Sequence, residues 1–531
     1  MTFRVLVCDP ISDDGVAVFK NAKGFTVDVK TGLSEDEICK IVHHYDALVV
    51  RSQTKVTDKI ICAGTQLKII GRAGVGLDNV DTEAATRRGI VVMNTPGGNT
   101  TSTAELSFAM LLALSRLIPQ ANTSLRSGQW DRKSFKGVEV SGKTLGILGM
   151  GRIGTEVARR ARAFNMKVIA YDPYASEEMA KQIGVEIKDL DSVIQAADYL
   201  TIHTPLTDET RNLINRERLA RMKKGARIIN CARGGIVNEK DLVEALNSGQ
   251  IAGAAFDVYS KEPPEDRSLI EHPKTVCTPH LGASTEEAQS VVAVEVAHQI
   301  VDALTGKGIR NAANIPFIDP KLMEQLSPYL VLGEKLGLLG AQLAKGFVSE
   351  MAIDYSGEVT EYDVHPITVA ILKGALAPFV DHAEVNAVNA PYIAKERGLV
   401  YTETKSSNIQ TFTNLINVTL KAKDREISLS GAVTAEKNPH IVRIDGYHVD
   451  MKPFGWHLLV FNQDKPGLIG AVGTILGDAG VNISDMTLGR KEKGGSALAA
   501  IALDEIISEK ILNNIRLIQQ VISASLVNMG K

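Results

Sequence analysis

The sequence has few cysteines, and they are scattered along the chain. Its five cysteines are Cys8, Cys39, Cys62, Cys231 and Cys277. They form no Cys-x-x-Cys pair and no spacing typical of a metal site. This pattern excludes a disulfide scaffold, indicates reduced thiols in a cytoplasmic protein, and gives no reason to expect a bound metal.

Long hydrophobic runs and a strong excess of charge are also lacking. The most apolar helical stretch, 108–118, contains Ser115 and Arg116 and is too short to span a bilayer. The N-terminus resembles a first strand rather than a secretion signal. A net charge of -3 gives no electrostatic reason to expect a nucleic acid or membrane partner. The 531 residues indicate a soluble globular protein of about three domains.

What the sequence does contain is two series of short apolar runs separated by helical patterns. Their continuous apolarity is typical of parallel strands covered on both faces. The first series is expected at 5–8, 26–29, 47–50, 68–70 and 90–93, and a long helix at 102–126. The second is expected at 144–148, 167–171, 199–203, 227–230, 252–256 and 275–277, followed by a helix at 284–304. Six strands with helices between them predict a doubly wound nucleotide-binding unit.

A Gly-x-Gly-x-x-Gly turn stands between the first strand and the first helix of the second series. Gly149, Gly151 and Gly154 are spaced for a dinucleotide pyrophosphate at a helix N-terminus. Asp172 ends the next predicted strand, where a carboxylate binds ribose hydroxyls and repels a 2′-phosphate. The pattern therefore predicts NAD rather than NADP as cofactor. The alternative for Asp172 is a simple turn residue before Pro173.

Polar segments follow the last three strands of this series. They are 231–237, 257–264 and 278–285. Because parallel strands bring their carboxyl ends to one edge, these segments are expected to converge on the nicotinamide. His280 suits proton transfer, Glu262 would orient its imidazole, and Arg233 would grip a 2-oxo-carboxylate. Each residue alone has an ordinary structural explanation, but their joint placement favours catalysis.

These motifs resemble the signature segments of the D-isomer-specific 2-hydroxyacid dehydrogenases. The resemblance covers residues 1 to about 310 and rests on Gly-Met-Gly-Arg-Ile-Gly, Asn-Cys-Ala-Arg-Gly-Gly-Ile-Val, Lys-Glu-Pro-Pro and Pro-His-Leu-Gly-Ala-Ser-Thr. It implies that Arg233, Glu262 and His280 are the catalytic trio. It also implies cofactor contacts at Arg152, Ile153, Thr204, Cys231, Asp257 and Gly282.

Within that family, segments 50–56 and 71–81 resemble the members that oxidise phosphoglycerate. The resemblance implies NAD-dependent oxidation of 3-phospho-D-glycerate to 3-phosphohydroxypyruvate, the first step of phosphorylated L-serine synthesis. Rivals are a related hydroxypyruvate or glyoxylate reductase, and an NAD-sensing protein like the transcriptional corepressors that resemble this family. The C-terminal tail and the lack of a basic arm argue against the corepressor.

Arg51 and Arg72 both follow apolar strands on the expected cleft side of the first unit. Two guanidinium groups could hold a carboxylate and a phosphate at opposite ends of the substrate. Gly74 is expected to offer its backbone N–H, and Asn99 a hydrogen bond. The alternatives are that Arg51 binds only the carboxylate and that Arg72 forms a packing ion pair.

The last part of the chain, from residue 456, predicts the order βαββαβ of a ferredoxin-like unit. It resembles an ACT domain. Asn462, Asp464 and Asn482 are expected to bind a free amino acid at a paired interface, with L-serine as the proposed effector. The alternative is an ACT domain that only assembles subunits.

The predicted domains are four, joined in one chain. A flavodoxin-like substrate-binding domain (1–98 and 285–312) holds a Rossmann-type NAD-binding domain (99–284) as an insertion, and an α+β intervening domain (318–452) and the ACT domain (455–531) follow. Lys405, Lys437 and Arg443 of the intervening domain could bind an anion or be solvated charges. The resemblance implies that Arg132 and Lys133 reach a neighbouring subunit, in a homo-oligomer that pairs through NAD-binding domains and forms a tetramer through the ACT or intervening domains.

Overall fold

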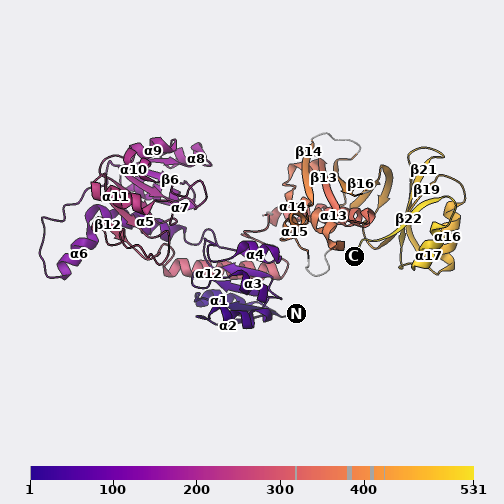
Figure 1. Ribbon diagram of the computed structural model, residues 1–531, viewed down its shortest axis with the longest axis horizontal. Helices are drawn as coiled ribbons and strands as arrows, with labels where there is room; N and C mark the ends of the chain where they lie inside the picture. The colour runs from indigo at the N-terminus through magenta and orange to yellow at the C-terminus, as the bar shows by residue number, and fades with distance from the viewer. Residues whose placement is uncertain (1, 317–319, 380–384, 407–411, 424, 531) are drawn as a thin grey trace.

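The computed structural model describes residues 2–316, 320–379, 385–406, 412–423 and 425–530. Within them the chain forms four β-sheets, arranged along the long axis of the molecule (Figure 1). The length alone indicated about three domains, whereas each of the four sheets has its own helices. The predicted domain limits at residues 1, 318 and 531 lie outside the described residues.

The first unit is a five-stranded parallel sheet with the order β2-β1-β3-β4-β5, which is the flavodoxin order. Its strands are β1 (Phe3–Val7), β2 (Phe25–Val29), β3 (Ala47–Val50), β4 (Ile69–Arg72) and β5 (Val91–Met93). One face is covered by α1 (Asp13–Asn21) and α12 (Glu286–Leu304). The other is covered by α2 (Glu35–Ile41), α3 (Asp58–Ala63) and α4 (Thr82–Arg87), and the short 3-10 helix η1 (Val42–His44) follows α2. The chain thus returns through α12 to complete this unit after the second one.

The second unit is a seven-stranded parallel sheet with the order β12-β11-β10-β9-β6-β7-β8. Its strands are β6 (Thr144–Leu148), β7 (Lys167–Tyr171), β8 (Val185–Ile187), β9 (Tyr199–Ile202), β10 (Ala226–Asn230), β11 (Ile251–Phe256) and β12 (Thr275–Cys277). Helices α5 (Thr100–Arg116) and α7 (Arg152–Ala163) lie on one face. Helices α9 (Leu190–Ala196), α10 (Arg216–Arg221) and α11 (Glu239–Ser248) lie on the other, and α8 (Glu177–Gln182) precedes β8. The prediction of a doubly wound unit is confirmed, but the sheet has seven strands rather than the expected six. The additional strand, β8, was missed because it is only three residues long.

The single helix predicted at 102–126 is wrong, because the chain breaks into α5 and α6 (Ile118–Arg126) at Leu117. Leu117 has a left-handed backbone with φ of 53°. Pro119 has no N–H to continue the helix, and its ring would clash with the carbonyl of Ser115. That carbonyl instead accepts from the N–H of Val138 at 2.9 Å. No single described helix is long and apolar enough to cross a membrane, and α5 and α6 meet that criterion only as a pair bent by 63°.

The third unit is a mixed sheet with the order β14-β13-β15-β16-β17-β18, packed on a long helix. Its elements are α13 (Pro320–Ala344), β13 (Val348–Gly357), η2 (Glu358–Glu361), α14 (His365–Leu376), η3 (Ala377–Phe379), α15 (Ala390–Glu396), β14 (Val400–Ser406), β15 (Asn414–Ala422), β16 (Arg425–Val433), β17 (Pro439–Ile444) and β18 (Tyr447–Met451). The α+β prediction is confirmed. The sequence pattern predicts a helix at 322–344 and strands at 350–355, 417–420, 427–433 and 440–444, which correspond to α13, β13, β15, β16 and β17, but it misses α14, α15 and the edge strands β14 and β18.

The fourth unit has the predicted βαββαβ order, with an antiparallel sheet β20-β21-β19-β22. Its elements are β19 (Trp456–Gln463), α16 (Leu468–Asp478), β20 (Ile483–Arg490), β21 (Ser496–Leu503), α17 (Glu509–Arg516) and β22 (Val521–Asn528). Both helices cover one face of the sheet. The other face packs on the third unit, since Leu459, Leu498 and Val527 join the same buried cluster as Leu336 and Leu339 of α13. The third and fourth units therefore share one core.

Candidate active site

A cavity of about 580 Å³ lies between the first and second units. Its walls are built from segments that follow the carboxyl ends of strands in both parallel sheets, the place where such sheets bind ligands. The predicted residues that line it are Arg51, Arg72, Gly74, Asn99, Ile153, Thr204, Cys231, Arg233, Glu262, His280 and Gly282.

The glycine turn has a different steric constraint at each of its glycines. Gly149 has φ of 94°, and a Cβ there would lie 2.7 Å from the His203 carbonyl oxygen. A Cβ on Gly154 would lie 2.0 Å from the Gly149 carbonyl oxygen, because helix and turn pack tightly there. A Cβ on Gly151 would meet nothing within 4 Å. The open space at Gly151, at the N-terminus of α7, is where backbone N–H groups can receive a phosphate.

Asp172 lies just beyond β7, beside this turn. Its carboxylate accepts from the N–H of Met150 and from the N–H of Tyr174, each at 2.8 Å. Asp172 therefore also holds the turn in place, and its contact with a ribose stays a prediction. Arg152 begins α7 but does not line the cavity.

The cofactor side of the cavity contains buried polar atoms that lack a partner. Thr204 Oγ1 and His203 Nδ1 are both buried without a hydrogen bond among the described residues. Such atoms cost about 1–3 kcal/mol each unless something satisfies them. Burial lowers the pKa of His203 to about 3, so its ring is neutral. The hydroxyl and amide groups of a dinucleotide are suitable partners, and the residues present therefore fit NAD.

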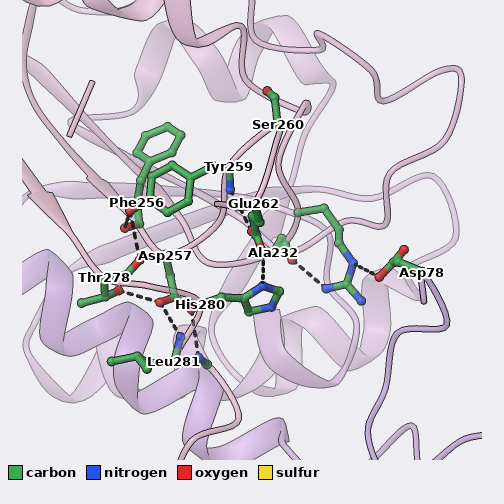
Figure 2. A network of polar contacts seen from close by, with 12 residues as sticks. Asp78, Ala232, Phe256, Asp257, Tyr259, Ser260, Glu262, Thr278, His280 and Leu281 are labelled. Carbon is green, nitrogen blue, oxygen red and sulfur yellow. Dashed lines mark hydrogen bonds and ion pairs between the residues drawn. The ribbon is translucent and has the colours of Figure 1, made fainter. Parts of the chain in front are cut away.

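His280 and Glu262 form a close pair at the cavity. Nδ1 of His280 lies 2.7 Å from Oε2 of Glu262, and Oε1 accepts from the Tyr259 N–H at 3.0 Å (Figure 2). Because a carboxylate only accepts, Nδ1 carries the proton and Nε2 keeps a lone pair. The hydrogen bond to Glu262 raises the pKa of His280, against the effect of burial. The pair can therefore take up a proton at Nε2.

Asp257 holds the loop that carries His280. Its fully buried carboxylate accepts from Thr278 Oγ1 at 2.6 Å and from the N–H groups of Leu281 and Gly282 at 2.7 and 2.9 Å. This fixes His280 in a left-handed backbone with φ of 55°, which costs about 1–2 kcal/mol. Asp257 does not line the cavity, so its implied cofactor contact stays a prediction.

Two of the cavity's arginines, Arg51 and Arg72, come from the first unit, whereas the glycine turn belongs to the second. Arg72 donates from Nε to Oδ1 of Asn79 at 3.1 Å. Burial, together with the positive charge of Arg233, lowers the pKa of Arg72 to about 10. Among the described residues Arg72 forms no ion pair, whereas Arg233 pairs with Asp78, so the contacts give no support to the alternative of a packing ion pair. A half-buried cation without a carboxylate partner among the described residues favours an anionic ligand.

Arg233 reaches the cavity from the loop after β10. Its Nη1 donates to the Ala232 carbonyl at 2.7 Å, and its Nε lies 3.4 Å from Oδ2 of Asp78. Arg51 donates from Nη1 to the Pro10 carbonyl at 3.3 Å. All three guanidinium groups are therefore held mainly by neutral oxygens, with Asp78 as the exception.

Two supporting residues were not singled out from the sequence. The buried Asp9 accepts from the Arg51 N–H at 2.6 Å and binds Thr54. Asn79 donates to the carbonyls of Arg51 and Thr54 at 2.7 and 2.6 Å while it accepts from Arg72. The available signal was the Asp-Pro step that follows the first strand and the Asp-Asn pair within segment 71–81.

The remaining predicted residues are placed as follows. The N–H of Gly74 donates to the Arg72 carbonyl at 2.9 Å and so is already engaged. Asn99 Oδ1 is buried without a partner. Cys231 is buried, which raises the pKa of its thiol to about 12. Arg132 and Lys133 do not line the cavity of their own chain. They follow α6, on the side of the second unit away from the first (Figure 1).

The three predicted effector residues do not lie together. Asn462 pairs with Ala497 near the Arg490 end of the last sheet, and Asp464 binds Arg490 at 3.2 Å. Asn482 lies at the other end of the sheet, directly before Ile483. Six residues of strand separate the two ends, so Asn482 lies about 20 Å from Asn462. Its side chain donates to Asp504 at 2.6 Å.

The suggested anion site of the third unit is wrong. Lys405 lies on β14 and Arg443 on β17, four strands apart, and Lys437 pairs with Glu324 at 3.3 Å.

Three family models match successive parts of the chain. The model of the D-isomer specific 2-hydroxyacid dehydrogenase NAD binding domain matches residues 108–282, that of the D-3-phosphoglycerate dehydrogenase intervening domain 325–445, and that of the ACT domain 456–516.

Similar proteins cover nearly the whole chain. A D-3-phosphoglycerate dehydrogenase of Synechocystis is 48% identical over 96% of this chain and 92% of its own length. One of Bacillus subtilis is 44% identical over 99% of this chain and 100% of its own. Among solved structures, a protein of Thermus thermophilus is 35% identical with a TM-score of 0.54, covering 59% of this chain and 100% of that one. A glyoxylate reductase of Paecilomyes thermophila is 29% identical, also with a TM-score of 0.54, covering 59% and 98%.

Proposed function

The chain belongs to the family of D-3-phosphoglycerate dehydrogenases, and on that premise we propose that it oxidises 3-phospho-D-glycerate to 3-phosphohydroxypyruvate. It is an NAD-dependent oxidoreductase. The observation that carries the substrate proposal is one cavity with a hydrogen-bonded His280–Glu262 pair on one side and Arg72 on the other, a half-buried cation that forms no ion pair with the described residues.

His280 carries out the proton transfer. Its Nε2 takes the proton of the substrate's C2 hydroxyl, since Nδ1 is committed to Glu262. Glu262 stabilises the imidazolium that results. Bound NAD supplies the hydride acceptor. Arg233 grips the carboxylate and draws charge toward the oxygen on C2 as the carbonyl forms.

The other two arginines of the cavity, Arg51 and Arg72, bind the phosphate of the substrate. Arg72 is fixed by Asn79, and the loop of Arg51 is fixed by Asp9 and Asn79. Both guanidinium groups are thus oriented before substrate arrives, which reduces the entropy lost on binding. Asn99, with its unpartnered Oδ1, adds a hydrogen-bond acceptor at the same cavity.

Steady-state assays of NADH formation test this proposal. Arg72→Ala should raise KM for 3-phosphoglycerate about 10- to 100-fold, the loss typical of hydrogen bonds to a charged group. The same variant should change KM for D-glycerate, which has no phosphate, by less than about threefold. Equal losses on both substrates would reject the phosphate role. Faster turnover of hydroxypyruvate or glyoxylate than of 3-phosphohydroxypyruvate by the wild type would favour the rival reductases.

We also propose that L-serine is the effector of the ACT domain. Support comes from the domain match and from Asn462, whose Oδ1 is buried and has no hydrogen-bond partner in the part of the chain that the structure describes. Calorimetric titration with L-serine should show binding together with a fall in activity. No heat and unchanged activity at millimolar serine would leave the domain with an assembly role only.

We propose further that the chain forms a homo-oligomer that pairs through its NAD-binding domains. Support comes from α6 and the loop after it, which project from the second unit and expose Ile118, Leu125 and Trp130 (Figure 1). Exposed large apolar side chains gathered on one projecting segment mark an interaction site. Sedimentation velocity gives the oligomeric state, and a monomer at micromolar concentration would reject the proposal.

A further inference from the structure

Asp78 connects the two walls of the active-site cavity. It lies between β4 and α4 in the first unit, whereas Arg233 follows β10 in the second unit. Both residues line the cavity, and Oδ2 of Asp78 lies 3.4 Å from Nε of Arg233. An ion pair at this position places a carboxylate of the protein on the group proposed to grip the carboxylate of the substrate.

The charges around the cavity make Asp78 distinctive. Three arginines line the cavity, and the carboxylates among its lining residues are Asp78 and Glu262. Glu262 uses both oxygens on His280 and Tyr259. Among the described residues no hydrogen bond and no second ion pair of Asp78 is recorded, and its side chain is 77% exposed. Asp78 therefore has no packing role that would explain its position.

The neighbouring backbone is shaped around this pair. A Cβ on Gly76 would lie 2.3 Å from Nη2 of Arg233 and 2.7 Å from Oδ2 of Asp78. Both charged groups thus rest against the backbone at residue 76, where any side chain would displace them. The contact is consequently a feature of the folded cavity rather than a chance approach of two long surface side chains.

We propose that Asp78 is an internal competitor for Arg233, which the substrate carboxylate must replace. This rests on the proposed function, in which Arg233 binds that carboxylate. Exposed ion pairs change an equilibrium by only about two- to fivefold, so the exchange is easily made by a dianionic or trianionic substrate. The competition lowers the affinity for every carboxylate ligand by a similar factor, so tight binding then depends on a second anionic group that reaches Arg72 and Arg51.

The test measures binding and catalysis in the full-length protein with Asp78→Asn, which removes the charge and keeps the shape. Oxalate serves as a carboxylate probe in calorimetric titration, and 3-phosphoglycerate as substrate. Asp78→Asn should bind oxalate about two- to fivefold more tightly and lower KM for 3-phosphoglycerate by a similar factor, with kcat unchanged or lower. Asp58→Asn is the matched control, because Asp58 is another exposed carboxylate of the same unit paired with an arginine, at 3.0 Å from Arg87.

The direction of the change in oxalate affinity distinguishes competition by Asp78 from a role in orienting Arg233. If Asp78 only orients Arg233, Asp78→Asn weakens oxalate binding and raises KM, which overturns the proposal, as does an unchanged affinity. Asp78→Glu should restore wild-type affinity. In the Arg233→Lys background, Asp78→Asn should increase the affinity for oxalate by a smaller factor than it does in the wild type. This comparison is a double-mutant cycle, which isolates the interaction between the two positions. Failure of the wild type to oxidise 3-phosphoglycerate would reject the proposed substrate, while the oxalate titration would still report on Asp78.

Discussion

Single residues set the chemistry of the cavity through their partners, as its two histidines illustrate. His203 is buried with Nε2 near Thr201 Oγ1, and burial lowers its pKa. His280 has a carboxylate partner in Glu262, and this hydrogen bond raises its pKa. The two environments shift the histidine pKa in opposite directions. His203 therefore stays neutral and can only form hydrogen bonds, whereas His280 can carry a proton.

The proton carrier should reveal itself in the pH dependence of oxidation. His280 must be neutral to accept a proton, so kcat/KM should fall as the pH drops through its pKa. Glu262→Gln removes the charge that raises this pKa but keeps an acceptor for Nδ1. The acidic limb of the profile should therefore move to lower pH, while the maximal rate falls about 10- to 100-fold as the imidazolium loses its stabilising charge.

The measurement is kcat/KM for NADH formation against pH, with Glu239→Gln as control. Glu239 is a nearby carboxylate that accepts from Ser260 and does not contact His280. Its profile should match the wild type. An acidic limb that stays in place in Glu262→Gln would assign it to a group other than His280.

The sequence located the side chains that line the cavity better than it located their supports. Arg233, Glu262 and His280 could be singled out because each follows an apolar strand, a purely local signal. Asp9 could not, since it binds backbone more than forty positions away at Arg51 and Thr54. The inward turn of Asp257 likewise depends on tertiary packing, which no local pattern encodes, because its partners lie more than twenty positions away.

Elements were predictable where their pattern was long and regular. All five strands of the first sheet and six strands of the second were found, because buried parallel strands are continuously apolar. The missed β8 buries only Val185, and the edge strand β14 has no fully buried residue. The break at Leu117 was visible in principle, since Pro119 stands two residues later.

The glycine turn offers a sharp test at this scale. Gly154→Ala places a Cβ 2.0 Å from the Gly149 carbonyl, so it should destabilise the second unit by about 1–3 kcal/mol. Gly151 has φ of -67° and open space, so Gly151→Ala should fold normally. That Cβ would instead crowd a bound phosphate and raise KM for NAD.

Urea unfolding and NAD titration distinguish the two variants. The expected pattern is lower stability for Gly154→Ala, and unchanged stability with weaker NAD binding for Gly151→Ala. If Gly151→Ala binds NAD as tightly as the wild type does, the pyrophosphate does not lie against Gly151.

At the scale of the whole molecule, both faces of the last sheet are covered by other elements of the chain. Its helices cover one face, and α13 covers the other, with Gln342 donating to the Asn528 carbonyl at 3.0 Å. The predicted effector residues stand at opposite ends of this sheet. One chain therefore cannot enclose a serine with all three, but two chains related by a twofold axis can, because each end then meets the other end of the partner.

Mixing variants tests this arrangement. Asn462→Ala and Asn482→Ala should each abolish serine binding alone, because each removes one half of both symmetric sites. After subunit exchange, half of the dimers are hybrids with one intact site, so about a quarter of the wild-type serine capacity should return. Mixing Asn462→Ala with Asp464→Ala, which stand at the same end, should restore nothing. Equal recovery in both mixtures, or none in the first, would mean that the three residues do not combine across a subunit interface.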